Sequence, residues 1–209
     1  MRLSKGFRVA VCAVAVIALS VGAQTVRADT ISGSIWENDA TGANDASLAN
    51  VPGTTPDVTF SVSSPLTFAS GGAYTIGEFL TSGGATVLTG AGELGNTLFN
   101  TFFDFKGTVT VTNGQTFTVT HDDGLSLDIG GVLVIDQPGP TAPVTQTFTY
   151  SGASGNLPFE LTYGECCGAP AELQISLPLS NAVPEPSSIV LLGAVLLGLG
   201  ASLKRKIVS

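Results

Sequence analysis

Residues Thr116 to Asp136 read TFTVTHDDGLSLDIGGVLVID and show the strand pattern of this chain most clearly. Apolar residues occupy alternate positions on both sides of a His-Asp-Asp-Gly turn at 121–124, which is the period of a strand with one buried face. A Gly-Gly pair at 130–131 separates two further alternating runs and suits a short hairpin. The stretch therefore predicts successive strands joined by tight turns.

Alternating runs of the same kind occur on both sides of this stretch. They cover residues 57–62, 108–112, 144–150, 157–163 and 173–177. The Asn113-Gly114 pair between two such runs favours a tight hairpin, whereas Gln137–Pro143 and residues 37–56 read as loops. Helical periodicity is hard to find, so residues 29–180 predict one all-β domain, an antiparallel β-sandwich.

Charge separates the middle of the chain from its ends. Between residues 29 and 183, fifteen acidic side chains face one basic residue, Lys106, which gives a net charge of −14. A nucleic-acid-binding protein needs clustered Lys or Arg to replace counterions, so this class is excluded. Binding of anionic lipid through this part of the chain is excluded for the same reason. Cationic partners, metal ions and neutral, hydroxyl-rich ligands remain.

Residues 1–28 have the pattern of a signal peptide for export. The basic residues at its start are Arg2, Lys5 and Arg8. An uncharged apolar run follows at 9–19, and small residues allow cleavage after Ala23 or after Ala28. The alternative is an uncleaved anchor, but the apolar run is short for a membrane span of about 20 residues. We therefore expect an exported protein.

The segment 181–209 contains a second targeting pattern. Pro184, Glu185 and Pro186 precede an uncharged apolar run at 189–203, which predicts a single transmembrane helix. The basic tail that closes it consists of Lys204, Arg205 and Lys206. Such a cluster keeps the end of the helix on the cytoplasmic side. The alternative is an ordinary tail anchor.

The order and spacing of these C-terminal features resemble the PEP-CTERM sorting signal. The resemblance implies an exported bacterial protein that an exosortase processes near Pro184-Glu185-Pro186. It implies a place in the cell envelope, anchored by one helix, or release to the extracellular matrix after processing. Proteins with this signal are associated with exopolysaccharide and biofilm matrix.

Asp122 and Asp123 are the sharpest local feature of the acidic domain. Two adjacent carboxylates in a turn repel one another unless a cation or several backbone N–H groups stabilise them. Calcium prefers carboxylate and carbonyl oxygens, so it suits this position. The alternative is a structural turn, since Asp side chains accept hydrogen bonds from nearby backbone N–H groups.

The pattern over 100–177 resembles the PA14 domain. The residues that match it by kind are Asp122, Asp123, Gly124, Leu127, Ile129, Gly131, Leu133, Ile135 and Asp136. In the lectin branch of that family a cis peptide joins the two aspartates, which bind Ca²⁺, and the ion coordinates sugar hydroxyls. The resemblance therefore implies Asp122 and Asp123 as calcium ligands. This sequence departs from the family at Asp128 and Gly130.

The same resemblance implies a second ligand loop at 164–168. Its residues are Gly164, Glu165, Cys166, Cys167 and Gly168, and Glu165 is a third candidate calcium ligand. His121 and Gly124 belong to the first ligand loop. His121 reads as a solvated residue at a strand end rather than as a catalytic base.

Cysteine use fits export to an oxidising compartment. Cys12 lies in the predicted signal peptide, so Cys166 and Cys167 remain in the mature chain. They can pair with each other as a vicinal disulfide or pair between chains. A site with soft metal ligands is disfavoured, because His121 is the sole histidine and no further cysteine is left.

These observations favour a binding protein over an enzyme. We find no nucleophile elbow, Walker loop or metalloprotease helix motif, and adjacent aspartates rarely flank a glycosidic bond. We expect an exported surface protein that binds carbohydrate, such as exopolysaccharide, with the help of calcium. The alternatives are a structural matrix protein without a specific ligand and a polysaccharide-active enzyme.

Overall fold

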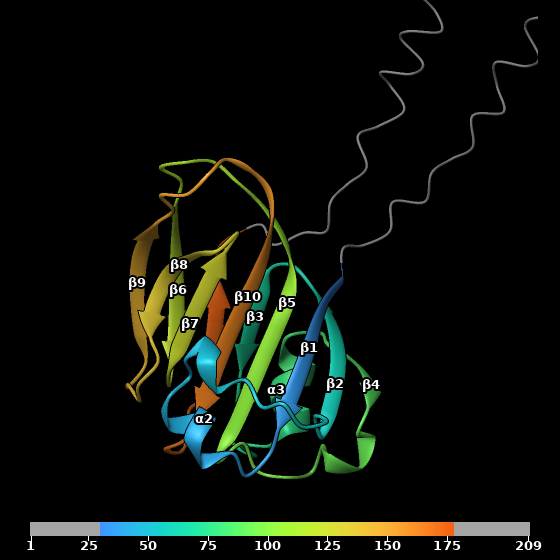
Figure 1. The fold of residues 1–209 in the computed structure, drawn as a ribbon. Coiled ribbons are helices and arrows are strands. Elements are labelled where there is room, and N and C mark those ends of the chain that lie inside the picture. Colours follow the sequence, from blue (N-terminus) through green and yellow to red (C-terminus); the bar gives the residue numbers. More distant parts are fainter. Residues whose placement is uncertain (1–29, 178–209) are drawn as a thin grey trace, which may run out of the picture.

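The alternating runs form two antiparallel sheets that pack face to face in the computed structural model, which describes residues 30–177 (Figure 1). The larger sheet contains, in spatial order, β4 (Thr86–Thr89), β2 (Val58–Ser63), β1 (Thr30–Trp36), β5 (Thr101–Val111), β10 (Gly155–Glu165), β7 (Leu125–Ile129) and β8 (Val132–Gln137). The smaller sheet contains β3 (Leu66–Ala69), β11 (Glu172–Ile175), β6 (Thr116–Asp122) and β9 (Val144–Thr149). The prediction of an antiparallel β-sandwich is confirmed.

The core between the sheets is rich in aromatic side chains. Phe68 of the smaller sheet stacks on Phe79 at a centroid distance of 5.1 Å, and Phe79 stacks on Tyr163 at 5.8 Å. Phe103 and Phe105 of β5 lie within 6.3 Å of each other in the same cluster. Because such rings bury large apolar areas and pack in preferred geometries, they hold the two layers in register.

Short helices interrupt the strand order in two places that the sequence did not indicate. The helix α3 (Ile76–Ser82) begins at Thr75, whose side chain accepts the N–H of Glu78, and it buries Phe79 in the core. The segment predicted as an extended loop at 37–56 contains α2 (Ala40–Asn44) and the 3₁₀ turn η3 (Leu48–Asn50). A second 3₁₀ turn, η4 (Ala91–Glu93), precedes β5.

The turns join the strands in ways that only partly match the expectations. The Gly130-Gly131 hairpin is confirmed, since Ile129 pairs with Val132. The predicted hairpin at Asn113-Gly114 is wrong, because β5 and β6 belong to different sheets and the turn carries the chain from one to the other. The Asp122–Gly124 turn makes the return crossing, from β6 to β7.

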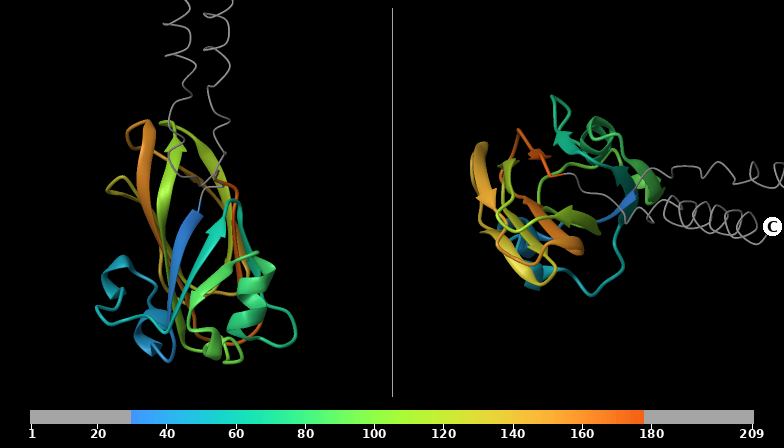
Figure 2. Two further views of the ribbon diagram at one scale, coloured as in Figure 1. Left: turned by 90° about the vertical axis from the view of Figure 1, so that its right-hand side faces the viewer. Right: turned by 90° about the horizontal axis from the view of Figure 1, so that it is seen from above.

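The Asp122–Gly124 turn lies far from both ends of the described chain. Asp122 pairs with Glu172, and β11 then runs away from the turn until Ile175 pairs with Val119. The strand β1 likewise starts at the opposite end, and Figure 2 shows that the described chain starts and finishes at one end of the sandwich. The predicted signal peptide (1–28), the Pro184–Pro186 motif, the predicted helix (189–203) and the basic tail fall outside the described residues. Within residues 30–177, no helix has both the length and the apolar character needed to cross a membrane.

Candidate functional site

A surface groove of about 400 Å³ lies over the Asp122–Gly124 turn. Three loops form it: this turn, the β8–β9 loop and the loop that follows β10. The lining residues are Asp122, Asp123, Pro140, Thr141, Ala142, Pro143, Cys167, Gly168, Ala169 and Pro170. The structure thus brings the aspartate pair together with part of the predicted second loop.

Asp122 presents a carboxyl group that no described backbone or side-chain N–H stabilises. A cis peptide bond joins it to Asp123, as the lectin resemblance implies. Burial, the neighbouring Asp123 and the cross-strand Glu172 raise the pKa of Asp122 to about 6. The charges of Asp123 and Glu172 therefore both act on the Asp122 carboxyl group, and a cation beside it would relieve this repulsion.

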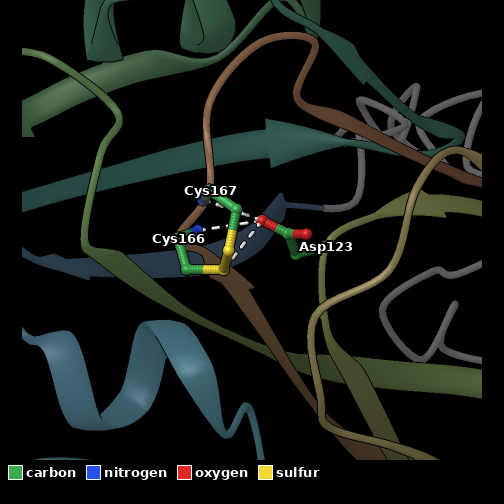
Figure 3. A group of neighbouring side chains, drawn as sticks. All are labelled: Asp123, Cys166 and Cys167. Atoms are coloured by element: carbon green, nitrogen blue, oxygen red, sulfur yellow. Dashed lines mark hydrogen bonds between the residues drawn. A yellow bond between two sulfur atoms is a disulfide. The ribbon is translucent and has the colours of Figure 1, made fainter.

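Asp123 has the opposite surroundings, because backbone N–H groups of two loops donate to its carboxylate. Its Oδ2 accepts from the N–H of Cys166 (3.0 Å) and of Cys167 (3.2 Å), as Figure 3 shows. Its Oδ1 accepts from the N–H of Thr141 (3.2 Å) in the β8–β9 loop. Asp123 therefore ties both walls of the groove to the turn, which is the behaviour of a structural turn residue.

Cys166 and Cys167 form a disulfide with each other, which is one of the two pairings that the sequence left open. Among the described residues, Asp123, Cys166 and Cys167 also group their ligand atoms within 4.8 Å of one another. Sulfur binds a metal as the thiolate, so this disulfide cannot supply such a ligand. Any metal at the groove therefore relies on oxygen.

Glu165 does not join the aspartates as a third ligand, and this expectation is corrected. Its side chain is fully buried below the groove, where the hydroxyl of Tyr74 donates to Oε1 (2.5 Å) and the hydroxyl of Tyr163 lies 2.8 Å from Oε2. The Tyr163 hydroxyl also donates to the carbonyl of Asp122.

The surroundings of Glu165 favour its neutral form. Burial raises the pKa of Glu165 to about 8, and the nearby Asp123 and Asp122 act in the same direction, whereas hydrogen bonds from Tyr74 and Tyr163 oppose the shift. The raised pKa favours the protonated form of Glu165 near neutral pH, and the side chain supports the turn from below the groove through the two tyrosines.

His121 and Gly124 shape the turn from inside the domain. His121 is buried rather than solvated, and its Nδ1 donates to the carbonyl of Asp123 (2.6 Å) while its Nε2 lies 3.1 Å from the Gln137 side chain. At Gly124 any side chain would stand 2.0 Å from the carbonyl oxygen of Pro138, so glycine is required there.

Glycine is required at two positions of the second loop, for a different reason at each. A side chain at Gly164 would stand 2.6 Å from the carbonyl oxygen of Ala43, so this glycine allows the α2 segment to approach β10. Gly168 lines the groove and has a φ of 110°, which side chains rarely tolerate.

Known proteins are similar to this chain in two regions, the C-terminal segment and the described domain. Residues 182–206 match the family described as the PEP-CTERM protein-sorting motif. The PA14 domain of the antifreeze protein MpAFP is similar to the described domain, with a TM-score of 0.50 and 20% identity, and the match covers 74% of this chain and 84% of that one. A PA14 sugar-binding domain from an RTX adhesin is similar with a TM-score of 0.52 and 18% identity over 71% and 88%.

The chain carries a PEP-CTERM sorting motif after a domain with the PA14 fold. The motif implies an exported protein that an exosortase-type enzyme processes at the C-terminus. No curated protein sequence matches the chain.

Sequence reasoning missed part of the groove of this PA14-fold domain. The sequence predicts a loop at Pro140, Thr141 and Pro143 but no role for it, and no pattern marks Tyr74 as part of the site. The loop composition gave no sign that it faces the aspartates. One signal in the sequence could have indicated a tyrosine at the site. Tyr163 ends an apolar strand directly before the predicted second loop.

Proposed function

We propose that the PA14-fold domain binds carbohydrate, such as exopolysaccharide, in the groove over Asp122 and Asp123 with the help of a calcium ion. The observation that carries the proposal is the Asp122 carboxyl group. It faces the groove without an N–H donor, beside Asp123 and Glu172. A hard cation that takes carboxylate oxygens suits this surrounding better than any other class of ligand.

The residues present fit calcium in a defined way. Asp122 offers a carboxyl group that lines the groove, and Oδ1 of Asp123 keeps a lone pair because it accepts one N–H, from Thr141. Oδ2 of Asp123 accepts two N–H groups and is therefore not free for an ion. When bound, calcium would supply open coordination positions for hydroxyl oxygens.

The rest of the groove suits a neutral ligand rich in hydroxyl groups. Pro140 and Pro143 offer apolar surface, and Thr141 offers a hydroxyl group. The acidic character of the domain disfavours an anionic polymer unless a cation bridges the two. We propose a binding protein without enzymatic turnover, acting at the cell envelope or in the extracellular matrix.

Calorimetric titration of the purified full chain with calcium chloride tests the ion. We expect saturable binding that Asp122→Asn weakens at least tenfold, a loss of about 1.4 kcal/mol of binding free energy. The matched control is Asp128→Asn, which keeps its bond to the N–H of Gly131 at the opposite end of β7. Absence of calcium binding, or equal affinity in Asp122→Asn, would contradict the calcium site.

A panel of neutral sugars and exopolysaccharide fractions, with and without EDTA, tests the ligand. Retention that EDTA abolishes supports the proposal. Retention that EDTA leaves unchanged supports carbohydrate binding without calcium. Breakdown of a polysaccharide on incubation would indicate the enzyme alternative, and no retention at all would favour a structural matrix protein.

A further inference from the structure

The Cys166–Cys167 pair meets Asp123 in an unusual way, because two successive backbone N–H groups point at one carboxylate oxygen. Both N–H groups donate to Oδ2, and Sγ of Cys166 lies 3.2 Å from the same atom (Figure 3). In an extended strand, successive N–H groups point in opposite directions. The chain must therefore leave the strand geometry of β10 at this point.

The disulfide is the covalent link that holds this departure. It joins neighbouring side chains, so it closes a small ring that contains the peptide bond between Cys166 and Cys167. A ring of this kind restricts the backbone of both residues, and holding a backbone in one conformation otherwise costs free energy for each residue. The bond therefore keeps the two N–H groups together before any ligand arrives.

Both oxygens of Asp123 depend on this arrangement. With Oδ2 fixed by the disulfide loop, the carboxylate plane is set and Oδ1 is left to the β8–β9 loop and the groove. On the other side of the ring, the backbone of Gly168 lies near the hydroxyl of Tyr74, which donates to Glu165. The loop is thus held at both ends, and the disulfide lies at its centre.

We propose that Cys166 and Cys167 are positioning residues that orient Asp123 through their oxidised pair, so that the groove binds its ligand in the disulfide form and loses affinity in the dithiol form. This inference rests on the proposed function of the groove. Dithiothreitol supplies the two electrons and two protons that convert the S–S bond into two thiols, and it becomes a cyclic disulfide. An exported protein meets an oxidising compartment, where the binding form persists.

The test uses the full chain with Cys12→Ser, so that thiol chemistry reports on this pair alone. Calcium affinity is measured in the oxidised protein, after reduction with dithiothreitol, and after re-oxidation. We expect at least about a tenfold loss on reduction, because the two residues regain backbone freedom, and full recovery on re-oxidation. The double variant Cys166→Ser/Cys167→Ser should match the reduced protein and ignore dithiothreitol.

A second measurement separates positioning from loss of fold and does not need a ligand. Backbone amide proton signals of Cys166, Cys167 and Thr141 report hydrogen bonds to the Asp123 carboxylate. We expect reduction to shift the first two upfield and to leave the signals of the β5–β10 pairing unchanged. Unchanged amide signals and unchanged calcium affinity after complete reduction would overturn the inference.

The outcomes also separate this inference from the function on which it rests. If the oxidised protein binds neither calcium nor sugar, the proposed function fails, and the amide signals alone decide whether the disulfide orients Asp123. If the oxidised protein binds and the reduced protein binds equally well, the proposed function stands and the inference fails.

Discussion

At the residue scale, two adjacent aspartates of one turn have different surroundings. Asp122 faces the groove with a raised pKa, whereas three backbone N–H groups donate to Asp123. Removing the Asp123 side chain leaves these three N–H donors without a partner. An unpaired buried donor costs about 1–3 kcal/mol of folding free energy.

Asp123→Ala is therefore expected to lower the free energy of unfolding by about 2–4 kcal/mol, measured by urea denaturation. Asp122→Asn is the matched control, and its stability at pH 7 should be equal to or above that of the parent, because a like charge disappears. Equal losses in both variants would show that the two aspartates do not differ in their structural role.

The stability of the protein should depend on pH through Glu165, because burial raises the pKa of this group in the folded protein from 4.5 to about 8. Between these values the folded state holds a proton that the unfolded state has released. Stability should therefore fall as pH rises from 5 to 8, by at most about 4 kcal/mol.

The neutral variant Glu165→Gln keeps an acceptor for the tyrosine hydroxyls and has no proton to lose. Its unfolding free energy, measured by urea denaturation at several pH values, should be flatter over the same window. A parent protein whose stability rises between pH 5 and pH 8 would contradict the assignment of a buried neutral acid.

At the scale of elements, the sequence predicted the positions of strands well, but it predicted less well which strands pair with one another in a sheet. Alternation at 116–120 and 125–129 located β6 and β7, because it reports one buried face. It does not report which sheet a strand joins, so the Asn113-Gly114 turn looked like a hairpin although it links the two sheets.

The candidate site also has features that the sequence indicates and features that it does not. Adjacency in sequence exposed the Asp122–Asp123 pair, and order along the chain located the loop at Cys166–Cys167. The burial of Glu165 depends on Tyr74, which is 91 residues away, and the groove wall at Thr141 depends on a loop that carries no motif. Such long-range contacts leave no periodic trace in a sequence.

The contact between the turn and the β8–β9 loop makes a prediction at this scale. In Gly124→Ala the new side chain would stand 2.0 Å from the carbonyl oxygen of Pro138, so the backbone of the loop must move. We expect a loss of about 2–4 kcal/mol in unfolding free energy, together with weaker calcium binding.

Gly139→Ala, in the β8–β9 loop on the other side of this contact, is the control, because nothing lies within 4 Å of its new side chain. It should change the stability by less than about 0.5 kcal/mol. Equal effects of the two substitutions would show that the close approach at Gly124 does not hold the loop.

At the scale of the whole molecule, the acidic side chains have few cations among them. Lys106 is the sole basic residue between 29 and 183, and it pairs with Asp104 (2.9 Å) and Glu160 (3.1 Å). The net charge of −14 over this range therefore repels itself.

Salt should stabilise this domain. Raising sodium chloride from 0.01 to 0.15 M shortens the Debye length from about 30 Å to about 8 Å. We expect the midpoint of thermal unfolding, followed by circular dichroism with EDTA present, to rise by a few degrees. EDTA removes calcium, so any rise in the midpoint reports the screening of charge repulsion by salt. An unchanged or lower midpoint would contradict the prediction that salt stabilises the domain.

The sorting motif follows the domain that contains the groove in sequence. Residue 177, after which the motif at 182–206 follows in sequence, lies at the opposite end of the sandwich from Asp122 and Asp123. Deleting 182–209 should move the protein from the membrane fraction to the soluble fraction, measured by fractionation and immunoblotting. The calcium affinity of the truncated protein should equal that of the full chain, because the deletion removes none of the described residues 30–177 that form the groove. Truncated protein that stays with the membranes would contradict the role of this segment as the anchor, and a lower calcium affinity would show that the two ends of the domain are coupled.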